Sequence, residues 1–227
     1  MTELLPCFEV EPATPPDGTV LWLHGLGASG HDFEDVVPLL RRPATRFVFP
    51  HAPQRAVTIN MGLIMPAWYD IRDFGGRADE DARGIADSAR RIEALVERER
   101  ERGVPPGRLV LAGFSQGGAM ALHVGHRYPG RLLGILALSA YELLPATHAA
   151  EAAAANATTP VLLCHGTRDP VVPLTAGRAA RDAFASPGRD VRWREYPMEH
   201  QMCLPEIDSI REWLAERFAS LASADAG

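Results

Sequence analysis

Short apolar runs alternate with longer amphipathic segments along the whole chain. The apolar runs are short and uninterrupted by charge, which is typical of strands buried inside a sheet. They cover residues 19–23, 46–49, 108–112, 132–138 and 160–164. A further run, 191–196, alternates polar and apolar positions and therefore predicts a strand with one exposed face.

The amphipathic segments between these strands predict helices. They cover residues 31–42, 79–102, 117–128 and 174–184, followed by a last helix that contains residues 207–221. Buried strands that alternate with helices indicate an α/β protein, whose mostly parallel sheet is covered by helices on both faces. No linker or internal repeat divides the chain, so we predict one α/β domain over residues 1–227.

One long connection, residues 51–78, interrupts the alternation of strands and helices. It contains two prolines, the sequence Trp68-Tyr-Asp70, and a pair of glycines at positions 75 and 76. Connections of this length inside compact domains are usually functional. We therefore expect this segment to contribute to a site.

Composition and charge indicate which kinds of molecule the protein is expected to bind. The chain has 227 residues, of which 46% are hydrophobic and 23% charged, as in ordinary globular proteins. Its net charge is −6, and its densest basic stretch, residues 97–102, alternates Glu with Arg. That pattern is typical of a solvated helix face, whereas a nucleic-acid interface needs a basic patch. We expect no nucleic-acid partner.

The sequence carries no targeting or cross-linking signal. No basic and apolar leader is visible at the N-terminus, and no apolar stretch is long enough to span a bilayer. The three cysteines, Cys7, Cys164 and Cys203, cannot all pair and lack the spacing of a zinc site. We expect a cytoplasmic protein without membrane insertion, metal or cofactor.

The strongest chemical signal is Gly113-Phe-Ser115-Gln-Gly117, which matches the G-x-S-x-G pattern. It directly follows a predicted buried strand and directly precedes a predicted helix. In that position the two glycines allow a sharp turn that lifts the serine hydroxyl above the sheet. Ser115 is therefore the candidate nucleophile.

A nucleophilic serine needs a base and an acid, in the chain order serine, acid, histidine for this architecture. His200 lies after Ser115, in a loop between the last predicted strand and the last helix. Asp169 follows the strand at 160–164 and precedes His200. The other acids that compete with Asp169 are less well placed along the strands. They are Glu142, Asp190, Glu195 and Glu199.

An oxyanion hole requires the amide after the nucleophile, here Gln116, and a second amide from an early loop. The loop His24-Gly-Leu-Gly-Ala-Ser-Gly30 supplies it, and Leu26 is the expected donor. The same loop matches the dinucleotide pattern G-x-G-x-x-G. That alternative requires an acid after the next strand, but residues 46–49 are followed by Pro-His-Ala-Pro.

Several motifs taken together resemble the phospholipase/carboxylesterase family, which includes bacterial carboxylesterases and eukaryotic acyl-protein thioesterases. These motifs lie at residues 49–53, 57–60, 65–70, 113–122 and 165–173. The resemblance covers about residues 17–217 and implies an α/β-hydrolase fold with no lid domain. It also implies that carboxylic esters are hydrolysed, with lysophospholipids or thioesters as substrates in some members.

Matching the motifs residue by residue implies the same triad and oxyanion amides, and makes Trp68 a wall of the acyl pocket. Two departures from the family pattern affect the expected substrate range. Ala28 stands where the early loop usually has an acid, and Glu199 and Gln201 flank the histidine where small residues are common.

We therefore expect a serine carboxylesterase that acts on soluble esters of short to medium chain length. The long connection carries Ile64, Met65 and Trp68, enough to line one side of an acyl slot without sealing it. Lysophospholipase or acyl-protein thioesterase activity is the alternative on the same triad. A non-catalytic binding protein and an oxidoreductase are the alternatives from other classes. The expected partner is a small ester substrate, and a homodimer stays open.

Overall fold

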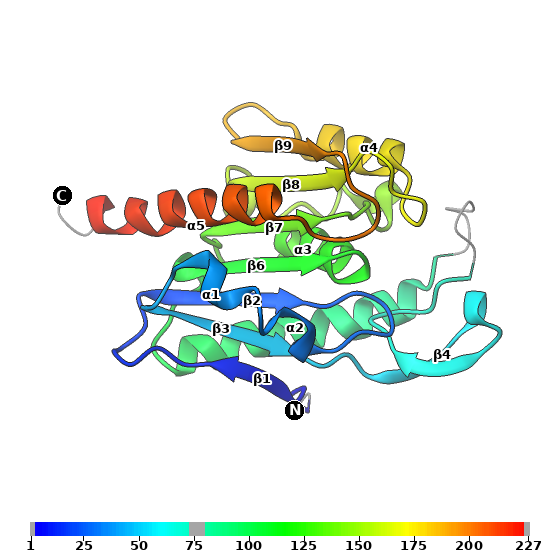
Figure 1. Cartoon of the computed structure of the whole chain (residues 1–227), viewed down its shortest axis with the longest axis horizontal. Helices are drawn as coiled ribbons and strands as arrows, with labels where there is room; N and C mark the ends of the chain where they lie inside the picture. The colour runs from blue at the N-terminus through cyan, green and yellow to red at the C-terminus, as the bar shows by residue number, and fades with distance from the viewer. Residues whose placement is uncertain (1–2, 73–79, 225–227) are drawn as a thin grey trace.

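A seven-stranded sheet forms the centre of the computed structural model, which describes residues 3–72 and 80–224 (Figure 1). The strand order is β1-β3-β2-β6-β7-β8-β9. The strands are β1 (Cys7–Val10), β2 (Gly18–Leu23), β3 (Thr45–Pro50), β6 (Leu109–Phe114), β7 (Gly134–Leu138), β8 (Val161–Gly166) and β9 (Val191–Tyr196). Every neighbouring pair is parallel except β1 with β3, so the predicted, mostly parallel sheet is confirmed.

Helices cover both faces of this sheet. They are α1 (Val37–Leu40), α2 (Ala82–Glu101), α3 (Gln116–Arg127), α4 (Leu174–Phe184) and α5 (Leu204–Ala224). Alternate residues of each strand face opposite sides. In β2, Leu21 and Leu23 join the apolar core under α2, α3 and α4, whereas Val20 and Trp22 join the core under α1 and α5. Figure 1 shows α5 crossing one face of the sheet, with α2 and α3 on the other. In the described part of the chain, no helix combines the length and apolar character needed to cross a membrane.

The prediction of one continuous helix over residues 31–42 is wrong. The segment instead forms a 3₁₀ turn at Gly30–Phe33 and the single short helix α1. Pro38 stands in the first turn of α1, where its missing N–H and its ring prevent a continuous helix from the preceding residues. Arg41 then ends α1 in a left-handed conformation, with φ of 52°.

The long connection also contains structure that the sequence pattern did not predict. Within residues 51–72, β4 (Gln54–Val57) and β5 (Leu63–Pro66) pair as an antiparallel hairpin that lies outside the main sheet. The glycine pair at 75 and 76 lies outside the described residues. The edge strand β1 was likewise not predicted, because its four residues are only half-buried.

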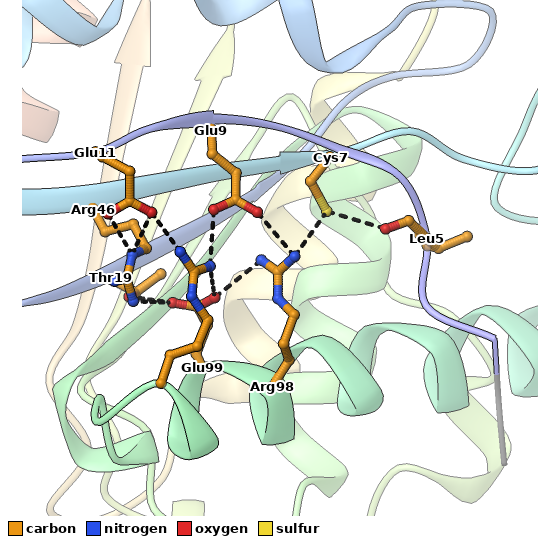
Figure 2. A network of polar contacts seen from close by, with 9 residues as sticks. Leu5, Cys7, Glu9, Glu11, Thr19, Arg46, Arg98 and Glu99 are labelled. Carbon is orange, nitrogen blue, oxygen red and sulfur yellow. Dashed lines mark hydrogen bonds and ion pairs between the residues drawn. The ribbon is translucent and has the colours of Figure 1, made fainter.

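A buried carboxylate joins β2 and β3 to the end of α2 (Figure 2). Glu99 is fully buried, and its carboxylate accepts hydrogen bonds from Thr19 Oγ1 at 2.9 Å and Arg46 Nη1 at 2.8 Å. Arg98 and Arg102 donate to its other oxygen at 3.0 and 2.8 Å. Burial alone would raise the pKa of Glu99, but the hydrogen bonds from Arg46 and Thr19 and the charge of Arg102 hold it below its usual value.

We expect Glu99→Gln to lower the free energy of unfolding at pH 7 by about 3 kcal/mol, because the buried Arg46 guanidinium then keeps only the exposed Glu11 as its counter-charge. A group whose pKa is lowered by folding stabilises above its unfolded pKa, and that contribution is lost as the pH falls. The difference between wild type and variant should therefore shrink below about pH 4.5. Urea unfolding across this range measures it.

The exposed neighbour Glu101 provides the control, since Glu101→Gln should change stability by less than about 0.5 kcal/mol. Equal effects of the two substitutions at pH 7 would contradict the role given to Glu99.

Candidate active site

Ser115 occupies a strained turn between β6 and α3. Its backbone has φ of 55° and ψ of −120°, a conformation that side-chain-bearing residues rarely adopt. A Cβ atom on Gly117 would overlap the carbonyl oxygens of Leu23 and His24, so only glycine permits this close approach. The Ser115 N–H donates to Leu138 O at 2.8 Å, which ties the turn to the adjacent strand β7.

Three side chains from distant parts of the chain meet at this turn. His200 Nε2 lies 2.8 Å from Ser115 Oγ, and His200 Nδ1 lies 2.7 Å from Asp169 Oδ2. The carboxylate fixes the ring with its proton on Nδ1, which leaves Nε2 to accept the serine proton. The arrangement can therefore activate the hydroxyl of Ser115 as a nucleophile.

The loop after β8 presents the acid to the histidine. The Asp169 side chain is fully buried, and its Oδ1 accepts N–H bonds from Val171 and Val172, both at 2.8 Å. These bonds leave Oδ2 directed at His200. The loop backbone therefore fixes the orientation of the Asp169 carboxylate toward the histidine.

The loop that carries His200 packs directly against the loop that carries Asp169. Arg168 N–H donates to Met198 O at 3.1 Å, and its guanidinium donates to Pro197 O. The ring of His200 lies against Phe114, with centroids 4.9 Å apart. Thus the relative position of base and acid is set by backbone contacts as well as by their own hydrogen bond.

The competing acids are engaged elsewhere in the fold. Glu142 lies 2.6 Å from His148, Asp190 pairs with Arg192, and Glu195 pairs with Arg178. The side chain of Glu199 is exposed. Of the five candidate acids, the structure brings Asp169 to His200.

The early glycine-rich loop borders the serine on one side. Gly27 adopts φ of 74°, and its N–H donates to Pro66 O of the β4–β5 hairpin at 2.8 Å. His24, fully buried at the end of β2, donates from Nδ1 to Gly25 O and accepts at Nε2 from Ala52 N–H. Burial lowers the pKa of His24, which suits this neutral, bridging role.

The two expected oxyanion amides both lie next to Ser115. Leu26 lines the pocket that contains the serine hydroxyl. Gln116 is the first residue of α3, so its N–H has no acceptor within the helix and points from the positive helix end. That both amides bind the developing oxyanion stays a prediction.

The side chain of Gln116 has a structural role that the sequence analysis missed. Its Oε1 accepts the Trp68 N–H at 2.9 Å, and its Nε2 donates to Tyr69 O at 2.8 Å. Trp68 is fully buried and donates from its indole to His24 O at 2.8 Å, while Ser88 donates to Trp68 O. The sequence offered one signal for this role: Gln116 directly follows the nucleophile at the start of a helix. A polar side chain that is buried there must find hydrogen-bond partners.

A pocket of about 470 Å³ opens beside Ser115 and His200. Its walls are mostly apolar and include Phe33, Val36 and Met202, none of which the sequence analysis singled out.

The three residues expected to contact an acyl chain lie outside the lining of this pocket. Ile64 and Met65 belong to β5, with Ile64 73% exposed, and Trp68 is fully buried. Their contact with substrate stays a prediction. Over the described residues, no group of three or more potential ligands is suited to a metal ion.

Comparisons with known proteins agree with this geometry. A family model described as Phospholipase/Carboxylesterase matches residues 6–217. Acyl-protein thioesterase 1 of Gibberella zeae is 39% identical over 90% of this chain and 92% of its own length. The protein of the same name from Yarrowia lipolytica is 35% identical, over 93% and 96%.

Solved structures with the same fold are also similar in sequence. The crystal structure of Arabidopsis thaliana SOBER1 is 28% identical, with a TM-score of 0.82, covering 88% of this chain and 98% of that one. Zea mays acyl-protein thioesterase 2 is 28% identical, with a TM-score of 0.81, over 94% and 99%. The α/β-hydrolase fold expected from the sequence is thereby confirmed.

A fluorophosphonate should add its mass to the peptide that contains Ser115, because the probe reacts with activated serine hydroxyls. Asp169→Asn should slow labelling by roughly 10³- to 10⁴-fold, since the asparagine would hold the histidine in the wrong tautomer. Intact-mass kinetics followed by peptide mapping measure the rate and the site.

Glu199→Gln is the matched control, because it neutralises the histidine's exposed neighbour and should keep the wild-type labelling rate. Labelling at another residue, or a larger effect of Glu199→Gln than of Asp169→Asn, would show that the assignment is wrong.

Proposed function

Because this chain belongs to the phospholipase/carboxylesterase family, we propose that it hydrolyses S-acyl thioesters of cysteine residues through an acyl-enzyme on Ser115. At the coarser level the chain is a serine hydrolase of ester or thioester bonds. The observation that carries the proposal is the continuous hydrogen-bonded chain from Ser115 Oγ through His200 to Asp169, with distances of 2.8 and 2.7 Å.

The proposed reaction proceeds in two halves. Ser115 Oγ attacks the acyl carbonyl carbon while His200 Nε2 takes its proton, and the resulting oxyanion is bound by the amides of Leu26 and Gln116. The carbon–sulfur bond then breaks, and His200 returns the proton to the departing thiolate. Water, deprotonated by His200, attacks the acyl-enzyme and releases the carboxylic acid and free Ser115.

The proposal names a thioester because relatives that match nearly the whole chain at 35–39% identity are named acyl-protein thioesterases. A soluble oxygen ester is the second candidate. It is favoured by similarity to the solved esterase PE8, at 28% identity and a TM-score of 0.82. The two candidates use the same nucleophile and differ in the leaving atom. We also propose a cytoplasmic location, where the three free cysteines would stay reduced.

We further propose that the β4–β5 hairpin supplies the contacts to the acyl chain. Ile64 and Met65 lie on β5, which the hydrogen bond from Gly27 N–H to Pro66 O holds beside the early glycine-rich loop. Trp68 has no exposed surface. Its contribution would be to hold the acyl side of the site in place, through its bonds to His24 and Gln116.

A matched pair of substrates tests the leaving atom. We expect kcat/KM for an S-octanoyl-cysteinyl peptide to exceed that for the O-octanoyl-seryl peptide of the same sequence by about tenfold or more, because a thiolate is a better leaving group than an alkoxide. Both rates should fall by about 10³-fold or more in Ser115→Ala. Thiol and acid release are measured after subtracting spontaneous hydrolysis.

Faster hydrolysis of the oxygen ester would replace the thioesterase proposal with the esterase candidate. Undiminished hydrolysis of both substrates by Ser115→Ala would exclude Ser115 as the nucleophile.

A further inference from the structure

The pocket beside Ser115 is lined by residues from outside the β4–β5 hairpin. Its walls come from the early loop, the turn at Gly30–Phe33, and the loops that carry Asp169 and His200. None of its described lining residues belongs to the hairpin. Its volume of about 470 Å³ lies in the range of small-molecule sites.

The chemistry of the triad places the departing group in this pocket. In the tetrahedral adduct on Ser115, the oxyanion faces the amides of Leu26 and Gln116. The departing atom must come within hydrogen-bond distance of His200 Nε2 to receive its proton. The pocket wall contains His200 itself and the next two residues, Gln201 and Met202. A group leaving toward His200 therefore enters this pocket, and under the proposed function the acyl chain extends toward the hairpin.

One carboxylate stands at the rim of the pocket. Asp32 is exposed and lines the pocket, and Oδ1 accepts both of its hydrogen bonds, from Ser29 N–H at 3.1 Å and Ser29 Oγ at 2.9 Å. Within the described part of the chain, this leaves Oδ2 able to accept from a ligand. No arginine is among the residues that line the pocket, and the nearby Arg168 guanidinium is bonded to Pro197 O.

Aromatic and apolar surfaces complete the environment of this carboxylate. Phe33 and Phe114 both line the pocket, and aromatic faces attract organic cations. Ala28 and Val36 contribute methyl groups rather than hydrogen-bonding atoms. A carboxylate beside aromatic rings and methyl groups suits a positive charge carried on a short apolar stem.

From this arrangement we propose that the pocket binds the leaving group, and that Asp32 makes the enzyme prefer leaving groups with a positive charge close to the departing atom. The inference rests on the proposed function, because it assigns the other half of the same substrate. A thiol on a basic peptide segment has this chemistry, and so does a small aminothiol. Asp32 is a specificity-determining residue here and takes no part in the proton transfers.

Four octanoyl substrates test separately the preference for a cationic leaving group and the preference for sulfur as the leaving atom. Octanoylthiocholine and S-(3,3-dimethylbutyl) octanethioate have the same shape and differ in the positive charge. Octanoylcholine and 3,3-dimethylbutyl octanoate form the corresponding oxygen pair. The ratio of kcat/KM within each pair reports the charge preference, and the comparison between pairs reports the leaving atom. An S-octanoyl peptide with Arg or Gln beside the cysteine distinguishes a peptide leaving group from a small one.

We expect the cationic member of each pair to be favoured by about two- to fivefold at low salt, as for a partly exposed ion pair, with the ratio falling as salt is added. Asp32→Asn keeps an oxygen for Ser29 and should bring the ratio close to one. Ala28→Asp adds a second carboxylate to the pocket and should raise the ratio. Glu34→Gln, which removes an exposed charge outside the pocket lining, should leave it unchanged.

A wild-type ratio of one or less, or a ratio that Asp32→Asn leaves unchanged, would overturn the assignment of Asp32. A different result would contradict the proposed function, namely faster hydrolysis of the two oxygen esters than of the two thioesters. In that case the charge ratio within the oxygen pair still decides the role of Asp32.

Discussion

The backbone conformation of Ser115 is the constraint on which the site depends. A backbone φ of 55° at a residue with a side chain destabilises the folded state by about 1–3 kcal/mol. Such a conformation persists only where the surrounding structure leaves no alternative. That structure is the junction of β6 and α3, where Gly117 lies against the end of β2 and Ser115 N–H is bonded to β7. The buried parallel sheet thus stabilises a turn that lifts one hydroxyl toward His200.

The parallel direction of the strands explains why the other members of the site arrive at the same place. The loops after β2, β6, β8 and β9 all leave from the carboxyl ends of parallel strands, so they meet at one edge of the sheet. Short backbone bonds then join the loops in pairs, as between Arg168 and Met198. The buried side chain of Gln116 extends the same framework to the segment around Trp68. The reacting groups are therefore positioned before any substrate binds.

The sequence predicted the parts of the molecule that depend on local and repetitive patterns. Uninterrupted apolar runs located the buried strands, and the chain order of Ser115, Asp169 and His200 anticipated the contacts that the structure contains. The hairpin at residues 54–66 was not predicted, because its strands are short and largely exposed and carry no periodic apolar face. Asp32 was missed because its sequence context is that of an ordinary capping residue, and its place at the pocket arises only from the fold.

The central claim is that the acyl group passes through Ser115, and trapping that intermediate tests it most directly. The protein is mixed with an S-octanoyl thioester, quenched in acid on the millisecond scale, and analysed by intact mass and peptide mapping. The account predicts one octanoyl group per chain, on the peptide that contains Ser115, formed together with a burst of one thiol. Thiol release with no acylated protein in a time course that resolves the burst, or an octanoyl group on another residue, would contradict it.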